Sequence, residues 1–237
     1  MKEDKKIRIA LCLHGLSGGK NSKGRIVQTM RGYETINNYI LSKYDVDVFM
    51  HSWTMSSEKR MVDLYHPKKY LFEPQISFEG PTKYKFSSNF YKNMKSLYYS
   101  YQKVNQLKKS WEKENDFIYD YVIHSRFDMY ITRMKPNVIK ELDPTKIYFL
   151  GYNKKKLLDH FWLGSSDIMD KFIDLFDKIP DLEEDLKKIG SNNQYLNHDI
   201  IYLNAKKEGI DNQLTNLSGS LKGGTYPFRF QKKTDIF

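Results

Sequence analysis

The first 53 residues follow an order that few folds accommodate. Residues 6–13, KIRIALCL, are a short apolar run, and the segment after them, HGLSGGKNSKGR, is rich in Gly and Ser. Apolar residues then recur at nearly helical spacing over 25–42, and a second apolar run, DVDVFMHSW, covers 45–53. A strand, a Gly-rich loop, a helix and a second strand make a βαβ unit, whose two strands are parallel. Because helices cover both faces of a parallel sheet, we predict an α/β fold with a Rossmann-like, mostly parallel central sheet flanked by helices.

The rest of the chain adds further helices and strands around one irregular stretch. The strongest helix is predicted over 90–113, where apolar and aromatic side chains recur every three or four residues, and this stripe is expected in the core. Residues 54–85 lack clear periodicity and are predicted to form a long irregular excursion, while the tail, 211–237, is Gly-rich and mixed. The remaining predictions are strands over 121–123, 129–132, 146–150 and 161–166, and helices over 167–178, 181–189 and 194–208. The strand at 129–132 is expected to belong to a small antiparallel addition.

The composition is that of a globular domain, with 40% hydrophobic and 29% charged residues. We expect one domain over residues 1–237, because no linker or internal repeat divides the sequence. The single cysteine, Cys12, excludes an internal disulfide framework, and its apolar surroundings predict a buried core residue. The first residues are too polar for a signal peptide, and no run approaches the ~20 apolar residues of a membrane helix. A cytoplasmic protein without a transmembrane segment is therefore expected.

The formal net charge of +10 leaves two functional classes open. The lysines are dispersed, apart from the run at 154–156, which favours a solvated surface. We expect no nucleic-acid partner, because no nucleic-acid-binding motif accompanies the charge. The alternative is a basic module without catalysis that binds nucleic acid or an anionic surface, with Tyr and Phe side chains stacking on bases.

Polar clusters follow three of the predicted strands. HGLSGG comes after the first strand, HSW ends the second, and HSRFD follows the strand at 121–123. Ligands of open α/β sheets bind beyond the carboxyl ends of the strands, so these clusters predict one site. The glycines at 15, 18 and 19 fit neither the P-loop nor the dinucleotide fingerprint. The loop is therefore either a cradle for phosphate or a plain connection.

Arg126 and Asp128 are the most informative pair in these clusters. A carboxylate at a strand end can hold Mg²⁺ or Mn²⁺ against a departing diphosphate. The guanidinium of Arg126 can contact phosphate through two parallel hydrogen bonds, or it can orient Asp128. A purely structural Arg–Asp pair is the competing interpretation.

A family resemblance bears on this choice. The run MKSLYYSYQKVNQLKKSWEKENDFIYDYVIHSRFDMYI resembles the core signature of glycosyltransferases from large DNA viruses (chlorovirus-like) and from bacterial capsule or lipopolysaccharide loci. In that family an Arg-x-Asp strand stands in for the DxD metal motif of GT-A enzymes. DVDVFMHSW is similar to the family's second strand, DHFWLGSSDIMDKF to a later strand and helix, and NHDIIYLNAKKEGI to its closing helix, with Asp199 where Glu is usual. The resemblance covers most of residues 6–210, and the single acidic residue of SRFD departs from a true DxD.

The resemblance implies a GT-A-like fold and a metal-assisted hexosyl- or deoxyhexosyltransferase. The donor would be a nucleotide-diphosphate sugar, such as a UDP- or GDP-sugar, and the acceptor a hydroxyl of a glycan. Asp128 would hold Mn²⁺ or Mg²⁺, with His198 as a late metal ligand or, alternatively, a solvent-facing residue. The residues that would contact the donor are His14, Gly15, Arg25, His51, Trp53, Arg126, Gly164 and Ser165.

Two further points stay open at the level of the sequence. Trp53 would stack on the nucleotide base or lie in the core. An inverting enzyme needs a carboxylate that deprotonates the acceptor hydroxyl, for which Asp159 is our first candidate and Asp199 the second. A retaining mechanism is equally compatible with the sequence, and so is a GT-A fold that has lost catalysis.

Overall fold

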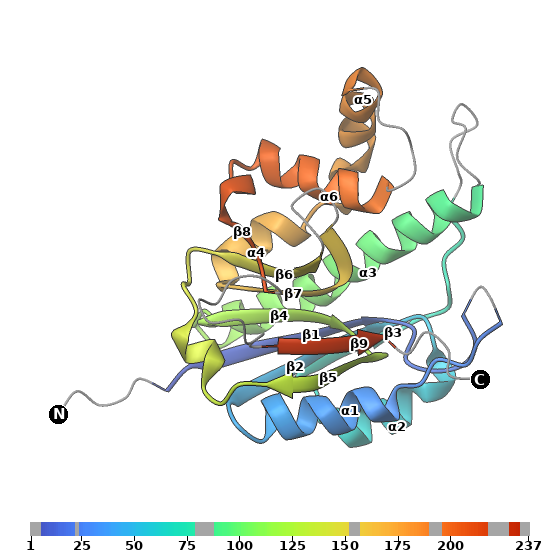
Figure 1. The fold of residues 1–237 in the computed structure, drawn as a ribbon. Helices are drawn as coiled ribbons and strands as arrows, with labels where there is room; N and C mark the ends of the chain where they lie inside the picture. Colours follow the sequence, from blue (N-terminus) through green and yellow to red (C-terminus); the bar gives the residue numbers. More distant parts are fainter. Residues whose placement is uncertain are drawn as a thin grey trace.

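The computed structural model describes residues 6–21, 24–78, 88–151, 157–189, 196–217 and 228–232 (Figure 1). Its strands are β1 (Arg8–Gly15), β2 (Asp45–Ser52), β3 (Lys69–Phe72), β4 (Tyr121–Arg126), β5 (Met129–Met134), β6 (Ile147–Gly151), β7 (Leu157–Gly164), β8 (Leu214–Asn216) and β9 (Phe228–Lys232). Its helices are α1 (Met30–Ile36), α2 (Glu58–Tyr65), α3 (Ser88–Glu114), α4 (Ser166–Ile173), α5 (Ile179–Ile189) and α6 (Leu196–Lys207). Shorter helical turns are η1 (Asn37–Leu41), η2 (Met55–Ser57), η3 (Val138–Glu141), η4 (Phe176–Lys178) and η5 (Asp211–Gln213).

The central sheet has seven strands in the order β3-β2-β1-β4-β7-β6-β8. Strands β1 to β4 pair in parallel, whereas β7 runs antiparallel to both of its neighbours, β4 and β6. A separate antiparallel pair, β5 with β9, continues the chain directly after β4. The predicted fold class, a mostly parallel sheet with helices and a small antiparallel addition, is confirmed.

Both faces of the sheet are buried, which explains the unbroken apolar run of β1. Alternate side chains of a strand point to opposite faces. Ala10 and Cys12 belong to the core beneath α3, while Ile9, Leu11 and Leu13 belong to the core beneath α1 and α2. Figure 1 shows α1 and α2 on one side of the sheet and α3, α4 and α6 on the other. As expected, Cys12 is fully buried, and burial raises the pKa of its thiol far above the usual range.

The longest helix, α3, packs along the sheet with its aromatic stripe. Met94, Tyr98, Tyr101 and Val104 are buried in the core on this face, and Trp111 packs against it. The predicted core role of the stripe is confirmed. This packing places α3 alongside the carboxyl ends of β1 and β2, where one of its few small polar residues, Ser100, is also buried.

The prediction of an irregular excursion over 54–85 is wrong for residues 55–65 and 69–72. Residues 55–57 form η2, α2 follows directly, and β3 pairs with β2 in parallel. Amphipathic helix α2 is only eight residues long and β3 only four, too short for periodicity to be recognised. Residues 79–85 lie outside the described part of the chain, as does the lysine run at 154–156.

The tail also contributes structure that was not predicted. Strand β8 extends the central sheet beside β6, and β9 pairs with β5. Within the described ranges, no helix combines the length and the apolar character needed to cross a membrane.

Candidate functional site

The order of the strands reverses between β1 and β4. The chain enters the sheet at β1, adds β2 and β3 on one side, and then returns to add β4 on the other side of β1. Ligands of open α/β sheets bind at such a reversal, beyond the carboxyl ends of the strands. In register, His14 lies beside His51 on β2 and beside Arg126 on β4. The three predicted polar clusters therefore meet at one edge of the sheet, which we call the carboxyl edge.

The Gly-rich loop leaves β1 at this edge. Gly15 has a φ of +95°, a conformation that glycine adopts without strain. The ring of His14 is fully buried and meets the ring of Tyr101 edge-on, with centroids 4.3 Å apart. His14 is thus part of the wall between β1 and α3 rather than an exposed group. Farther along the loop, Arg25 is exposed.

Three hydroxyl groups tie the loop to the end of β2. The Ser17 and Ser52 hydroxyl oxygens are 2.6 Å apart, and Ser57 in η2 bonds to the same Ser17 hydroxyl. The Ser52 hydroxyl also accepts the backbone N–H of Thr54 at 3.0 Å. These bonds hold the loop after β1 against the segment after β2.

His51 lies at the centre of a directed hydrogen-bond relay. Its Nε2 is 2.9 Å from the Glu73 carboxylate, and its Nδ1 is 2.6 Å from the Ser100 hydroxyl. Ser100 also accepts the backbone N–H of Gly15 at 3.1 Å. Burial lowers the pKa of His51, while Glu73 acts in the opposite direction. A neutral ring that donates from Nε2 and accepts at Nδ1 satisfies every bond in the relay.

The side chain of Trp53 belongs to the wall of the site. It is 8% exposed and stacks on Tyr99, with centroids 5.2 Å apart and planes 27° apart. Its ring also meets that of His51 edge-on at 4.7 Å. Trp53 is therefore packed inside the protein, as one of its two interpretations predicted, and its ring stacks on Tyr99 rather than lying open to a base. Burial and Glu73 together raise the pKa of Tyr99 to about 12, so its hydroxyl stays protonated.

Arg126 and Asp128 form a two-pronged ion pair at the end of β4. Nε and Nη2 of Arg126 each donate to a separate Asp128 oxygen at 2.7 Å. The side chains are 25% and 14% exposed, so the pair borders solvent. A Cβ added at Gly32 would lie 2.3 Å from the carbonyl oxygen of Phe127, which shows how closely α1 supports this turn. This is the geometry of the Arg–Asp pair that the sequence offered as one interpretation, because both carboxylate oxygens of Asp128 accept a hydrogen bond from Arg126.

The two candidate bases lie on different elements. The register of β4 with β7 brings the beginning of β7, which contains Asp159, to the carboxyl edge. The side chain of Asp159 lies outside the part of the chain that the structure describes. His198 in the first turn of α6 donates from Nδ1 to the carbonyl of Leu157 at the start of β7. Asp199 follows in the same turn, so the beginning of α6 also faces this end of β7.

Gly164 and Ser165 are not brought to the carboxyl edge. Because β7 runs antiparallel, Gly164 pairs with Val122 near the amino end of β4. A Cβ at Gly164 would lie 3.1 Å from Ile168 and Met169 side-chain atoms, so this glycine allows α4 to pack closely. Ser165 is the N-cap residue of α4, a position predicted for Ser166 or Asp167. The GSS segment is a strand-to-helix junction, and we leave it out of the site.

Glu73, Ser100 and Tyr99 were missed by sequence reasoning. Glu73 directly follows β3, and a prediction of that strand would have placed it at the carboxyl edge. Ser100 is a small polar residue inside the buried aromatic stripe of α3, an exception that marks a polar contact. Tyr99 lies next to it on the helix and has no comparable signal.

Candidate metal ligands are scattered over the described part of the molecule. Within it, no group of three or more His, Cys, Asp or Glu side chains could hold a metal ion. Asp128 provides a carboxylate of the kind that Mg²⁺ and Mn²⁺ prefer. The Nδ1 bond of His198 to a backbone carbonyl is the arrangement that orients metal-binding histidines for coordination through Nε2. Asp128 and His198 are each of a residue type that binds divalent metals, and a complete metal site would need further ligands.

Comparison with known proteins yields structural likenesses only. No protein-family profile matches the sequence, and no curated protein matches it. The structure is similar to apo mouse xyloside xylosyltransferase 1, with a TM-score of 0.47 and 10% identity over 90% of this chain and 84% of that chain. It is also similar to the glycosyltransferase GlyE of Streptococcus pneumoniae TIGR4, with a TM-score of 0.41 and 10% identity over 90% of this chain and 46% of GlyE. This chain thus spans less than half of GlyE, and neither score is high enough to transfer a function.

Proposed function

We propose that the chain is a glycosyltransferase that moves a sugar from a nucleotide-diphosphate donor to a hydroxyl of a glycan acceptor. The observation that carries the proposal is the reversal of strand order, where Gly15 at the end of β1 and the Arg126–Asp128 pair after β4 lie at adjacent strand ends. A diphosphate needs both backbone N–H donors and positive charge. A Gly-rich loop and an arginine at neighbouring strand ends supply this combination.

The leaving diphosphate is the group that the site must stabilise. As the bond from the sugar to the phosphate breaks, negative charge builds on the phosphate oxygens. Arg126 would take over a phosphate oxygen while Asp128 keeps its guanidinium oriented. The relay through His51 and Ser100 would hold the Gly15 amide, and with it the start of the phosphate-binding loop, in position.

A divalent metal would assist at the same place. Asp128 would contribute one carboxylate, His198 an imidazole, and the donor's phosphates the remaining oxygens, because Mg²⁺ sites commonly combine one or two carboxylates with substrate phosphates. When bound, the metal supplies charge neutralisation of the leaving group. The acceptor hydroxyl would lose its proton to Asp159, which we prefer to Asp199 because β7 begins at the carboxyl edge beside β4.

The test is thermal unfolding of the chain with UDP-, GDP-, dTDP- and CMP-sugars, each with and without Mn²⁺. A ligand that binds only the folded state stabilises it, by about 2.7 kcal/mol at a hundredfold excess over Kd, and so raises the melting temperature. We expect one nucleotide class to raise it, with a larger shift when Mn²⁺ is present. No shift with any donor would contradict the proposal.

An oligonucleotide titration separates this function from the alternative raised by the charge of +10. A basic binding module would bind single-stranded DNA or RNA with an affinity that falls steeply with salt. Transfer activity predicts donor binding without such oligonucleotide binding. The two measurements together decide between the two classes.

A further inference from the structure

Exposed apolar side chains lie close to the carboxyl edge, on the loop after β1 and on the turn after β2. Ile26 is 72% exposed, the highest value among the large apolar residues that the structure describes, and Met55 in η2 is 53% exposed. Met30, the first residue of α1, is 40% exposed. Single exposed apolar residues are common on protein surfaces, but three on neighbouring segments indicate a contact surface.

Hydrogen bonds join the two segments that carry these residues. The hydroxyls of Ser17, in the loop, and Ser57, in η2, bond to each other. Nη2 of Arg60 in α2 donates to the hydroxyl of Thr29 at 3.0 Å. The loop after β1 and the start of α2 therefore form one continuous surface.

The loop projects from the end of the sheet. Lys20 and Ile26 pair in an antiparallel β-bridge, so the chain doubles back between them. Figure 1 shows this part of the chain, in blue, beyond the carboxyl ends of β1 and β2. We call residues 16–31 and 54–60 together the loop surface.

The loop surface is strongly positive. Residues 16–31 contain no Asp or Glu, and Glu58 is the one acidic residue of 54–60. In the part of these segments that the structure describes, every basic side chain is exposed: Lys20, Arg25, Arg31, Lys59 and Arg60. Five cations therefore stand against one carboxylate, which favours an anionic partner.

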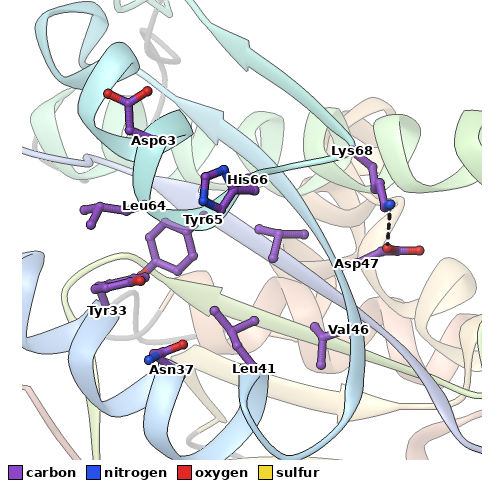
Figure 2. Close-up of a pocket in the computed structure, with 11 residues that line it drawn as sticks. Tyr33, Asn37, Leu41, Val46, Asp47, Asp63, Leu64, Tyr65, His66 and Lys68 are labelled. Carbon is purple, nitrogen blue, oxygen red and sulfur yellow. Dashed lines mark ion pairs between the residues drawn. The ribbon is translucent and has the colours of Figure 1, made fainter.

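The neighbouring part of the same face has a different balance of charge. A cavity of about 340 Å³ lies there between α1, β2 and the end of α2 (Figure 2). Two carboxylates, Asp47 and Asp63, line it together with one ammonium, Lys68, which pairs with Asp47 at 3.4 Å. Asp63 pairs with Lys59 of the loop surface at 2.6 Å. The excess of positive charge thus belongs to the loop surface and not to the cavity.

The combination of side chains on the loop surface distinguishes between anionic partners. Aliphatic side chains among cations are typical of protein surfaces that lie on an anionic bilayer, where cations attract the headgroups and apolar groups enter between them. Single-stranded nucleic acid instead needs aromatic side chains that stack on its bases. Residues 16–31 and 54–60 contain no Phe, Trp or Tyr. The loop surface therefore favours lipid over nucleic acid.

We propose that the loop surface binds membranes that contain anionic phospholipids. Ile26 and Met55 would enter the headgroup region, and the surrounding cations would lie against the lipid headgroups. The inference goes beyond the proposed transfer function, because it needs neither a donor nor the Arg126–Asp128 pair. Its test measures lipid binding in the absence of donor, so its failure is distinguishable from a failure of nucleotide-sugar binding.

The experiment is co-sedimentation of the whole chain with phosphatidylcholine vesicles, with and without about 30% phosphatidylserine. We expect binding to the anionic vesicles that weakens as salt rises, and far weaker binding to the neutral ones. Lys20→Gln/Arg25→Gln should weaken binding about 25-fold, since each cation near an anionic surface contributes about fivefold. Ile26→Ser should weaken it about tenfold, through the loss of buried aliphatic surface.

Matched control variants make the same changes at the opposite, amino edge of the sheet. Ile118→Ser removes an isoleucine that is 59% exposed and lies just before β4. Lys43→Gln/Lys113→Gln removes two exposed lysines, one just before β2 and one at the end of α3. Since these variants lose the same charge or the same kind of apolar side chain elsewhere, they should bind vesicles as the unmodified chain does. All the changed residues are exposed, so the fold should persist, which circular dichroism checks.

Four results would overturn the proposal. They are no binding to anionic vesicles, equal binding to neutral vesicles, equal losses in a variant and its amino-edge control, and unchanged binding by both loop-surface variants. Binding of a single-stranded oligonucleotide through Lys20 and Arg25, without binding to vesicles, would assign the loop surface to nucleic acid instead.

Discussion

Two polar clusters lie between α3 and the rest of the protein, and they differ in the elements that they connect. At the carboxyl edge, the relay of His51, Ser100 and Glu73 ends on a carboxylate with 22% exposure and reaches the backbone of Gly15. Two turns farther along α3, Lys108 is fully buried and donates to the Ser166 hydroxyl at 2.6 Å. It also contacts Asp170 at 2.8 Å and Glu112 at 3.0 Å.

The difference teaches what each cluster does. The Lys108 cluster joins α3 to α4. Lys108 and Glu112 are buried, Asp170 is 24% exposed, and the three charges pair with one another, so the cluster contributes to the fold. The relay connects a helix to a loop at the end of a strand and borders the candidate site. A buried polar group is therefore a functional signal only where its network opens towards a ligand-binding edge.

The largest effect is expected for Lys108→Met. Removing the ammonium leaves the carboxylates of Glu112 and Asp170 without their buried partner, and breaking a buried ion pair in this way costs about 3–5 kcal/mol. Urea unfolding followed by circular dichroism measures the loss. Lys109→Met is the matched control, since the Lys109–Asp174 pair is partly exposed and should change stability by about 1 kcal/mol or less. Equal losses in both variants would remove the distinction between the clusters.

The next largest effect tests the carboxyl edge. Asp128→Ala removes the group that orients Arg126, and we expect transfer to fall by about 10²–10³-fold, as for other electrostatic groups that act on developing charge. The fold should remain, because the pair borders solvent. Initial rates with the donor found in the thermal screen provide the measurement, and unfolding in urea provides the control. Transfer at the unmodified rate by Asp128→Ala would refute its assigned role.

His124 sharpens the comparison, because its ring is buried between the two clusters. Burial lowers its pKa to about 3, and the charge of Lys108 acts in the same direction. A histidine of the unfolded chain titrates near 6.5, so between these values the unfolded state binds a proton that the folded state does not. Stability is thus fully present above pH ~6.5 and falls below it by up to about 1.4 kcal/mol per pH unit.

The measurement is the slope of unfolding free energy against pH in urea experiments between pH 4.5 and 7. His124→Phe keeps a ring in the buried position and should make this slope shallower by about one proton, or ~1.4 kcal/mol per pH unit. The absolute stability of the variant does not enter the comparison. An unchanged slope would show that burial does not lower the pKa of His124 in the folded protein.

The smallest expected effect concerns the relay itself. Ser100→Ala removes the hydroxyl shared by the Gly15 amide and His51, which should cost about 1–2 kcal/mol of stability. Since the Gly15 loop is the proposed phosphate cradle, donor affinity should fall as well, by a few-fold. Thermal shifts with and without donor measure both quantities. Ser110→Ala on the same helix, whose hydroxyl bonds to the Leu107 carbonyl, should leave donor affinity unchanged.

Much of the fold could be predicted from local patterns. Strand β1, the loop at Gly15 and strand β2 follow from apolar runs and glycines, and the aromatic stripe of α3 follows from helical spacing. The adjacency of His14, His51 and Arg126 could also be expected, because the carboxyl ends of parallel strands share one edge. The short elements α2 and β3 could not, because eight and four residues do not establish a period.

The composition of the site required contacts between distant segments. His51 and Ser100 are 49 residues apart, and nothing in either local sequence pairs them. The exclusion of Gly164 and Ser165 depended on the direction of β7, which an apolar run does not reveal. The position of Trp53 could not be predicted either, since its stacking on Tyr99 depends on how α3 approaches β2.

The sequence by itself determined where the longer strands and helices lie, such as β1, β2 and α3, because burial requires apolar residues at the period of each element. It also determined that the parallel strands end in polar and glycine-rich turns. Only the tertiary structure decided that β7 runs antiparallel, that β9 pairs with β5, and that Ser100 and Glu73 meet His51. These features arise from packing and hydrogen bonds between residues far apart in the chain, which local periodicity does not encode.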